Sequence, residues 1–427
     1  MSTGTAFLVR EERGHWVGEV AAAVHAAGLR AVLVAPPLDE HERGELASVV
    51  DDVVAVEDVY DPDAVAAVIR AIDPAPAGVL TGSDGAIAST ARVAELLGVA
   101  RCPASVFELA RNKFAVREVL AEAGLPGPRC TLITAEDEAA AVAERVGLPA
   151  VVKPVNGAAS NLIRLVSTVD ELAAAYRLLA ERLPVSADPR YRRPLPGRDG
   201  SLLDPSTAFL VEGMLRGPEY ALDVVVRDGV VEPVEILDKP LIDERKFELA
   251  LSCPPQGLSG ERAALVADTG AAAVRALGLD NTVAHVEVID DETLGPTIVE
   301  VNAGRPAGSI MPLLAKLRTG IDVFAELVAL GLGAPPPERE APQLPIPLGM
   351  LILYASGSGR LEAIHGVEEL SELPEVLNVI TTVSPGQVLT DEQEIYVVNL
   401  VVAGFADHEE LAALHAEAAS MIKLELS

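Results

Sequence analysis

The chain has 427 residues, of which half are hydrophobic and only 3% aromatic, and it carries a net charge of −31. This length suits two or three folded units with ample core. The negative charge argues against non-specific binding to nucleic acid or anionic lipid, because both demand a basic surface. Three scattered cysteines are too few for a disulfide framework or a cysteine-rich zinc site. With no signal peptide and no apolar run near the roughly 18 residues of a membrane span, we expect a cytoplasmic protein.

The first part of the chain predicts a parallel α/β unit. Strands are expected at residues 6–9, 31–34, 51–56 and 78–80, with helices at 16–27 and 62–72. Strands spaced by helices imply a parallel sheet with helical crossovers. Ligands on such sheets gather at the carboxyl ends of strands, which makes Ser83 and Asp84 weak substrate-side candidates. The first strand is not followed by Gly-x-Gly-x-x-Gly, so a dinucleotide site is not expected.

A second unit begins near Pro103. Its expected helices are 113–123, 137–146 and 261–277, and its expected strands are 150–153, 208–212, 219–226 and 230–237. Residues 184–205, rich in Pro, Arg, Asp and Gly, predict a long exposed loop. The proline-rich residues 334–347 predict a linker to a β-rich tail with a closing helix at 408–422. The predicted domains are 1–105, 106–335 with a lid subdomain at about 115–206, and 336–427.

Two acids, Glu287 and Glu300, each lie within an apolar β-type run, and the polar turn 290–296 separates the runs. We therefore predict two neighbouring strands. Glu300 and Asn302 are two residues apart and point to the same face of a strand. Three oxygen ligands on one face suit a hard cation, most commonly Mg²⁺ carried by nucleotide phosphates. The alternative is a pair of edge-strand acids that face water.

Two further segments fit a nucleotide. Lys153 ends an apolar strand before a small-residue loop that contains Gly157 and Ser160. Such a lysine can reach phosphate oxygens while backbone N–H groups close over them, although the alternative is a solvated lysine before a turn. The strand at 208–212 breaks into a bend that suits the edge of a purine, and an acid shortly after suits ribose hydroxyls. The candidates in this segment are Glu212, Leu215 and Glu219, and the alternative is a hairpin with charged ends.

The order of these residues resembles the ATP-grasp superfamily. The series consists of Lys113, Lys153, Ser160, Glu212, Glu219, Glu287, Glu300 and Asn302. The resemblance implies that ATP contacts the two lysines, the loop and the hinge strand. It also implies that Glu287, Glu300 and Asn302 hold Mg²⁺, with Mn²⁺ as a substitute. The implied fold class is α/β and α+β multidomain, an ATP-grasp fold with an N-terminal parallel α/β domain and a β-rich C-terminal domain.

Residues 282–312 are most similar to L-amino acid ligases, whose pattern is Gly-Val-Ala-His-x-Glu, then Glu-Val-Asn-Ala-Arg-Pro-Ala-Gly. Residues 359–366, 375–383 and Gly386 resemble their C-terminal domain. In the family an arginine steadies charge on the reacting carboxylate. Here Gly304 displaces Arg305 by one place, and the role survives if Gly304 forms a bulge. Arg305, Asn302 and His285 are therefore the catalytic candidates, although His285 is equally well explained as a strand histidine satisfied by a carbonyl.

Two other segments border the expected substrate pocket. Residues 238–257 correspond in position to the substrate-covering loop of the family, and Ser252 and Cys253 stand where relatives often have a histidine. Cys253 has no base or basic cluster near it in sequence and gains nothing as a nucleophile candidate. His15 and Trp16 follow the first strand, and we favour a packing role at the start of the first helix over contact with substrate.

The resemblance implies an ATP-dependent carboxylate–amine ligase that forms an amide, dipeptide-like bond through an acylphosphate. We expect small-molecule amino acid or other carboxylate and amine substrates, neither nucleic acid nor membrane as a partner, and a homodimer as one assembly. The rival enzyme class is an ATP-grasp carboxylase or formyl-phosphate-type enzyme of nucleotide or biotin metabolism. The rival outside enzymes is a non-catalytic nucleotide-binding regulatory protein.

Overall fold

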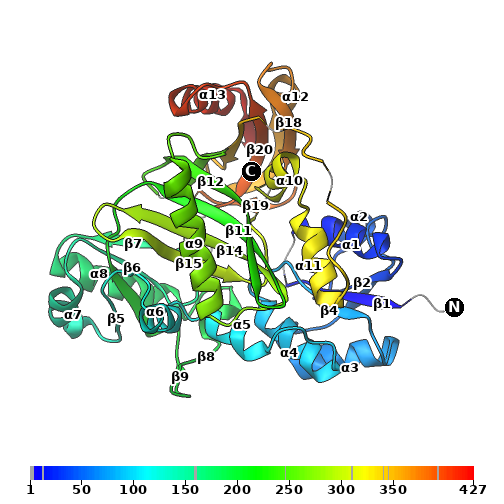
Figure 1. The fold of residues 1–427 in the computed structure, drawn as a ribbon, viewed down its shortest axis with the longest axis horizontal. Helices are drawn as coiled ribbons and strands as arrows, with labels where there is room; N and C mark the ends of the chain where they lie inside the picture. Colours follow the sequence, from blue (N-terminus) through cyan, green and yellow to red (C-terminus); the bar gives the residue numbers. More distant parts are fainter. Residues whose placement is uncertain are drawn as a thin grey trace.

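The computed structural model describes residues 4–11, 14–157, 161–245, 247–308, 311–339, 341–344, 346–391 and 394–427. Figure 1 shows an N-terminal unit in blue and a smaller teal unit on opposite sides of a large green and yellow sheet, with the C-terminal elements in orange and red beyond it. The mixed α/β and α+β architecture expected from the sequence is confirmed.

The N-terminal unit is a parallel sheet in the order β3-β2-β1-β4. Its elements are β1 (Thr5–Val9), α1 (Trp16–Ala26), β2 (Arg30–Ala35), α2 (Glu40–Leu46), β3 (Asp52–Ala55), α3 (Pro62–Ile72), β4 (Gly78–Leu80), α4 (Ile87–Leu97) and α5 (Ala104–Ala110). The strand order reverses between β1 and β4, and ligands bind to such sheets at the carboxyl ends of strands beside this reversal. Ser83 and Asp84 follow β4 at this edge.

The teal unit contains the antiparallel sheet β5-β10-β6-β7, which we call the lid sheet. Its elements are α6 (Lys113–Glu122), β5 (Cys130–Ile133), η1 (Glu136–Glu138), α7 (Ala139–Val146), β6 (Ala150–Pro154), β7 (Arg164–Val166), α8 (Val169–Arg182) and β10 (Phe209–Gly213). A buried cluster that includes Leu172, Leu179 and Phe209 holds α7 and α8 against the sheet.

Residues 184–205 are only in part the exposed loop that their composition predicts, since most of them are exposed or half-buried but the segment contains ordered elements and a few buried residues. They contain the short helix η2 (Pro189–Arg192) and a two-stranded hairpin of β8 (Leu195–Pro196) and β9 (Leu202–Leu203). Arg190 is 7% exposed and Tyr191 is 1% exposed. Proline and arginine are common in loops, but here the arginine is buried because it meets carboxylates of the N-terminal unit.

The large sheet has the order β15-β14-β11-β12-β13-β16-β20-β18. Its strands and the helices near them are β11 (Glu219–Arg227), β12 (Val230–Ile242), β13 (Glu248–Cys253), α9 (Gly260–Ala276), β14 (Thr282–Asp291), β15 (Gly295–Ala303), α10 (Met311–Thr319), α11 (Val323–Leu332), β16 (Leu348–Tyr354), β18 (Val376–Thr381) and β20 (Tyr396–Ala403). Helix α9 packs against β11, β12, β14 and β15, whereas α11 contacts β11 and β14 and also α1 and β4. Helix α11 therefore joins the N-terminal unit to the large sheet.

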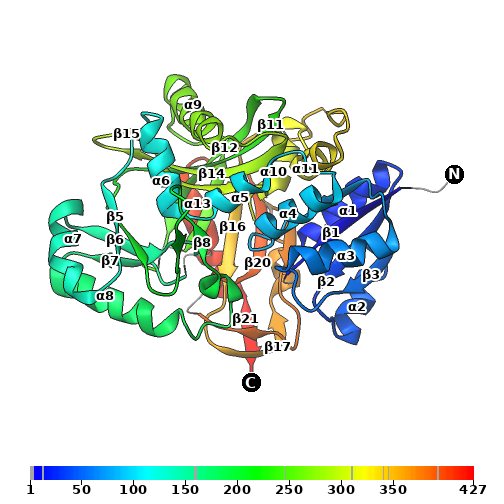
Figure 2. The same ribbon diagram turned by 90° about the horizontal axis from the view of Figure 1, so that it is seen from below.

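The prediction of a substrate-covering loop at residues 238–257 is wrong in part, because β12 continues to Ile242 and β13 runs from Glu248 to Cys253. The same sheet also crosses the predicted boundary at 335/336, since β13 pairs with β16. Figure 2 shows β16 and β20 between the lid sheet and the N-terminal sheet. The domain boundaries themselves stay a prediction.

The remaining C-terminal elements form a small sheet in the order β19-β17-β21 with two helices. They are β17 (Gly359–His365), α12 (Val367–Leu370), β19 (Val388–Leu389), α13 (His408–Met421) and β21 (Lys423–Leu426). Over the part of the chain that the structure describes, no helix is both long enough and apolar enough to cross a membrane.

Candidate active site

A cleft of about 3050 Å³ opens between the N-terminal sheet, the lid sheet, the large sheet and residues 381–396 of the C-terminal part. It is lined by nearly all of the predicted site residues: Lys113, Lys153, Gly157, Glu212, Leu215, Glu219, His285, Glu287, Glu300, Asn302 and Arg305. Ser160, also predicted, lies outside the described residues. Residues from widely separated parts of the chain therefore share one cleft, as the resemblance implies.

The two acidic strands are neighbours, as predicted. Strands β14 and β15 are antiparallel, and Glu287 lies opposite Glu300 while His285 lies opposite Asn302. The side chains of Glu287 and Glu300 are 22% and 28% exposed. Both acids thus face the cleft while their strands remain in the sheet, which the pattern of alternating apolar residues requires.

The donor set at these strands fits a hard divalent cation. Two carboxylates and an amide oxygen are ligands of the kind that Mg²⁺ prefers. Within the described residues, no group of three or more His, Cys, Asp and Glu side chains is arranged to hold a metal. An ion at Glu287 and Glu300 would therefore need Asn302 and oxygens from a bound phosphate or water, which is how Mg²⁺ is usually held beside nucleotides.

Lys239 is a functional candidate that the sequence analysis missed. Its ammonium is buried and lies 2.7 Å from Glu219 Oε1 and 3.6 Å from Glu287 Oε2, and it also pairs with Glu248. Burial opposes the charge, but the three carboxylates outweigh it and raise the pKa of Lys239 well above its ordinary value. The signal available in the sequence is a lysine that closely follows the apolar strand predicted at 230–237, within residues that the sequence assigns to a loop.

Glu212 and Lys153 form a buried ion pair at 2.6 Å, and Arg117 also pairs with Glu212. Glu212 and Lys153 lie on neighbouring strands of the lid sheet, β10 and β6. Burial raises the pKa of Glu212, but Arg117 and Lys153 lower it more, to about 2. Since both carboxylate oxygens contact cations, the geometry favours a role for Glu212 in orienting Lys153 over direct contact with a nucleotide.

His285 is not satisfied by a carbonyl, which was the alternative considered above. Its Nδ1 lies 3.0 Å from Asp223 Oδ1, and its Nε2 lies 3.7 Å from Glu287 Oε1. Burial lowers the pKa of His285, but hydrogen bonds to Asp223 and Glu287 raise it to about 9. At neutral pH the side chain is therefore a buried cation beside Glu287.

Arg305 faces the N-terminal unit, where its Nε donates to Asp84 Oδ1 at 2.8 Å and its Nη1 donates to the Pro306 carbonyl at 3.1 Å. Gly304 precedes it with φ of +88° and donates its N–H to Val283 at 2.8 Å. Gly304 does not form the bulge considered above as a way to keep the role of Arg305, because the irregularity between β14 and β15 lies at Glu287 and Val288. The left-handed turn at Gly304 redirects the chain after the last strand pair instead.

The segments after the first strand and at the end of β13 also border the cleft. Trp16 is 9% exposed and packs on Gly82, where a Cβ would come within 2.7 Å of the indole. His15 Nε2 lies 3.2 Å from the Thr382 carbonyl, so the N-terminal and C-terminal parts meet here. Cys253 is fully buried, and burial raises its pKa, which agrees with its rejection as a nucleophile.

Comparisons with known proteins support the fold and the family resemblance. The ATP-grasp domain model matches residues 146–312, and the model of L-amino acid ligase C-terminal domain 2 matches residues 351–427. The crystal structure of an L-amino acid ligase from Bacillus licheniformis has a TM-score of 0.78 with 23% identity and covers 100% of both chains. Uncharacterized protein y4rH of Sinorhizobium fredii is 28% identical over 73% of this chain and 60% of its own length. A D-alanine–D-alanine ligase of Ectopseudomonas mendocina is 27% identical over 58% of this chain and 74% of its own length.

The fold is therefore the ATP-grasp fold, as the sequence predicts. More particularly, the chain carries an ATP-grasp domain followed by an L-amino acid ligase-type C-terminal domain. The resemblance to L-amino acid ligases stated from the sequence is confirmed.

Proposed function

We propose that this protein is an ATP-dependent ligase that joins the carboxylate of one amino acid, or a related acid, to the amine of another. The product is an amide of the dipeptide kind, and ADP and phosphate are released. The observation that carries this proposal is the composition of the cleft. One wall presents Glu287, Glu300 and Asn302, and two lysines and Arg305 line the same space. A protein that only bound a nucleotide would have no need of the full set.

The roles of the chain's own residues follow from their charges. Lys113 and Lys153 bind phosphate oxygens of ATP, and residues near Leu215 and Glu219 face its adenosine. Glu287, Glu300 and Asn302 hold Mg²⁺, or Mn²⁺, which when bound neutralises phosphate charge during transfer. Arg305 holds the reacting carboxylate through the paired donors of its guanidinium.

The proposed chemistry has two steps. A carboxylate oxygen attacks the γ-phosphorus of ATP, the bond to ADP breaks, and an acylphosphate forms. The nitrogen of the amine then attacks the acyl carbon, the bond to phosphate breaks, and the nitrogen loses its proton to solvent. No residue forms a covalent bond, so the protein contributes positioning and charge stabilisation.

A screen of phosphate release against pairs of amino acids and related amines tests the proposal, with the product identified by mass spectrometry. Release that requires both an acid and an amine, together with an amide product, supports it. Release that depends on bicarbonate or formate favours the rival enzyme class. Nucleotide binding without turnover on any pair favours the regulatory protein.

A homodimer and a cytoplasmic location remain predictions that go with this proposal. Sedimentation of the purified chain tests the first, and fractionation of cells that express it tests the second.

A further inference from the structure

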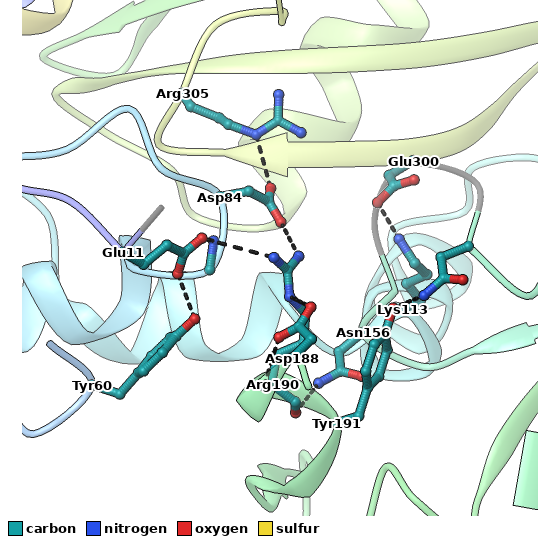
Figure 3. A network of polar contacts seen from close by, with 12 residues as sticks. Glu11, Tyr60, Asp84, Lys113, Asn156, Asp188, Arg190, Tyr191, Glu300 and Arg305 are labelled. Carbon is teal, nitrogen blue, oxygen red and sulfur yellow. Dashed lines mark hydrogen bonds and ion pairs between the residues drawn. The ribbon is translucent and has the colours of Figure 1, made fainter. Parts of the chain in front are cut away.

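Asp84 joins two arginines that reach it from different parts of the chain. Its Oδ1 accepts from Arg305 Nε at 2.8 Å, and its Oδ2 accepts from Arg190 Nη1 at 3.1 Å. Burial raises the pKa of Asp84, but the charges of Arg305 and Arg190 lower it more, so that it lies well below its ordinary value. Figure 3 shows the terminal nitrogens of Arg305 on the side away from Asp84. Asp84 therefore binds Nε of Arg305, and the two terminal nitrogens of the guanidinium point away from Asp84.

Arg190 is itself fixed by three acids. Besides Asp84, its Nε lies 2.6 Å from Asp188 Oδ2 and its Nη2 lies 3.8 Å from Glu11 Oε1. Glu11 in turn accepts from the Gly85 N–H at 2.7 Å and from the Tyr60 hydroxyl at 2.6 Å. These contacts leave Arg190 little freedom of orientation, so the position of Asp84 is determined from both sides.

The same segment contacts two asparagines that flank the loop predicted to hold ATP phosphates. The carbonyl of Arg190 accepts from Asn156 Nδ2 at 2.7 Å, and the hydroxyl of Tyr191 accepts from Asn161 Nδ2 at 3.2 Å. Asn156 and Asn161 flank the small-residue loop after Lys153. Arg190 thus contacts Asn156 through its backbone carbonyl. Its side chain contacts Asp84, which in turn binds Arg305 (Figure 3).

We propose that Asp84 and Arg190 are positioning residues for Arg305, and that they link the orientation of Arg305 to the loop after Lys153. This inference rests on the proposed function for the meaning of a correctly placed Arg305. Without Asp84, the two guanidiniums lose their shared counter-charge and repel each other, so the fork of Arg305 turns away from the carboxylate. Phosphoryl transfer and the placement of the carboxylate are then no longer coordinated.

The kinetic test uses Asp84→Asn, which keeps the shape of the side chain, and the acid and amine pair that works best with the wild type. We expect kcat to fall about 100-fold, as misplacement of a reacting group by an ångström can do, in a protein that still folds. The melting temperature is recorded alongside, because loss of a carboxylate shared by two arginines also lowers stability. The affinity for Mg²⁺ and a non-hydrolysable ATP analogue should stay within about twofold. Asp84→Glu, which restores the charge, should recover part of the loss. Normal turnover in Asp84→Asn overturns the inference.

A double-mutant cycle separates positioning from a merely structural role. If Asp84 acts through Arg305, Asp84→Asn in an Arg305→Lys background should add almost nothing to the loss, whereas independent losses multiply. Asp58→Asn is the matched control, because Asp58 pairs at 2.6 Å with Arg193 of the same segment and does not contact Arg305. It should leave kcat within about twofold. The inference is overturned if the losses of kcat in Asp84→Asn and Arg305→Lys multiply in the double variant. It is also overturned if Asp58→Asn loses as much kcat as Asp84→Asn.

A fluorescence arm needs no ligation. Trp16 is the single tryptophan and packs on Gly82, two residues before Asp84. The ATP analogue with Mg²⁺ should change its emission in the wild type and leave it unchanged in Asp84→Asn that still binds the analogue. An equal change of Trp16 emission in both proteins, or no change in the wild type, would contradict the inferred link between Asp84 and the loop after Lys153. If the wild type binds nucleotide but joins no acid and amine, the proposed function fails, while this arm still decides the inference.

Discussion

Lys113 and Glu300 form an ion pair across the cleft although 187 positions separate them in the chain. Lys113 lies at the start of α6, where Asn112 caps the helix by accepting from the N–H groups of Phe114 and Ala115. Glu300 lies on β15, opposite Glu287. The pair holds a phosphate-binding candidate and a metal-binding candidate in contact, so the charge of one sets the position of the other.

Glu300→Gln should lower turnover about 100-fold or more with the fold intact, because it removes a charge that binds Mg²⁺ and keeps the shape of the side chain. Glu292→Gln is the control, since Glu292 lies exposed in the turn between the same two strands. Phosphate release and the Mg²⁺ concentration for half-maximal rate are the measurements. Near-normal activity in Glu300→Gln would contradict the metal assignment.

Lys153→Met should weaken binding of the ATP analogue about tenfold or more, because a charge-assisted contact to phosphate is lost. The variant also removes one of the two cations, Lys153 and Arg117, that pair with Glu212, so the melting temperature must be recorded alongside the affinity. Lys423→Met, at an exposed position of β21, serves as the control in calorimetry. Wild-type affinity in a folded Lys153→Met protein would exclude the phosphate role.

Arg305→Ala should retain ATP affinity within about twofold but lose amide formation by about 100-fold or more, as expected for a contact that stabilises developing charge. Arg305→Lys should recover little, because an ammonium lacks the bidentate fork. Arg339→Ala, on an exposed ion pair with Glu232, is the control. Unimpaired ligation in Arg305→Ala would move the role to another cation, such as His285 or Lys239.

The lowered pKa of Glu212 predicts how the stability of the protein depends on pH in acid. Its pKa is lowered from 4.5 to about 2, so the stability it contributes is fully present above about pH 4.5 and is lost as the pH falls through 2. The shift corresponds to about 3 kcal/mol. Glu212→Gln should therefore lower the free energy of unfolding by this order at neutral pH. As the pH falls from 4.5 to 2, its free energy of unfolding should decrease less than that of the wild type.

Denaturant unfolding at a series of pH values measures this response. Glu136→Gln removes an exposed pair with Arg177 and should cost less than about 1 kcal/mol. Parallel stability curves for wild type and Glu212→Gln would show that Glu212 does not carry the effect.

Gly304→Ala should destabilise the protein and reduce ligation together. A Cβ there would meet Ile87 at 2.7 Å, and the φ of +88° is strained for a residue with a side chain. Strain of this kind costs about 1–3 kcal/mol, and relief by backbone movement displaces Arg305. Gly386→Ala has a similar φ of +91° and no atom within 4 Å of the added Cβ, so it isolates the conformational cost. Equal effects in both variants would exclude the steric contribution.

Alternating apolar residues around Glu287 and Glu300 predicted the paired acidic strands, and the helix bounds near Lys113 and Trp16 were within a residue or two. Local patterns succeed where one face of an element is buried. Helix α2 escaped prediction because Leu46 is its one buried residue, which leaves too little periodicity to detect. Arg190 escaped because its partners Asp84 and Glu11 lie in the N-terminal unit. Lys239 escaped because its three carboxylate partners lie on other strands of the large sheet, and local sequence does not show which strands come together.

The pairing of β13 with β16 has a consequence for protein engineering. A chimera that exchanges residues 336–427 between relatives would cut through one continuous ladder. The incoming β16 would have to pair with the native β13, and a mismatch there would expose N–H and C=O groups of β13 that invite association with other molecules. Exchanges of the C-terminal part should therefore take β13 and β16 from the same parent, so that the two paired strands stay matched.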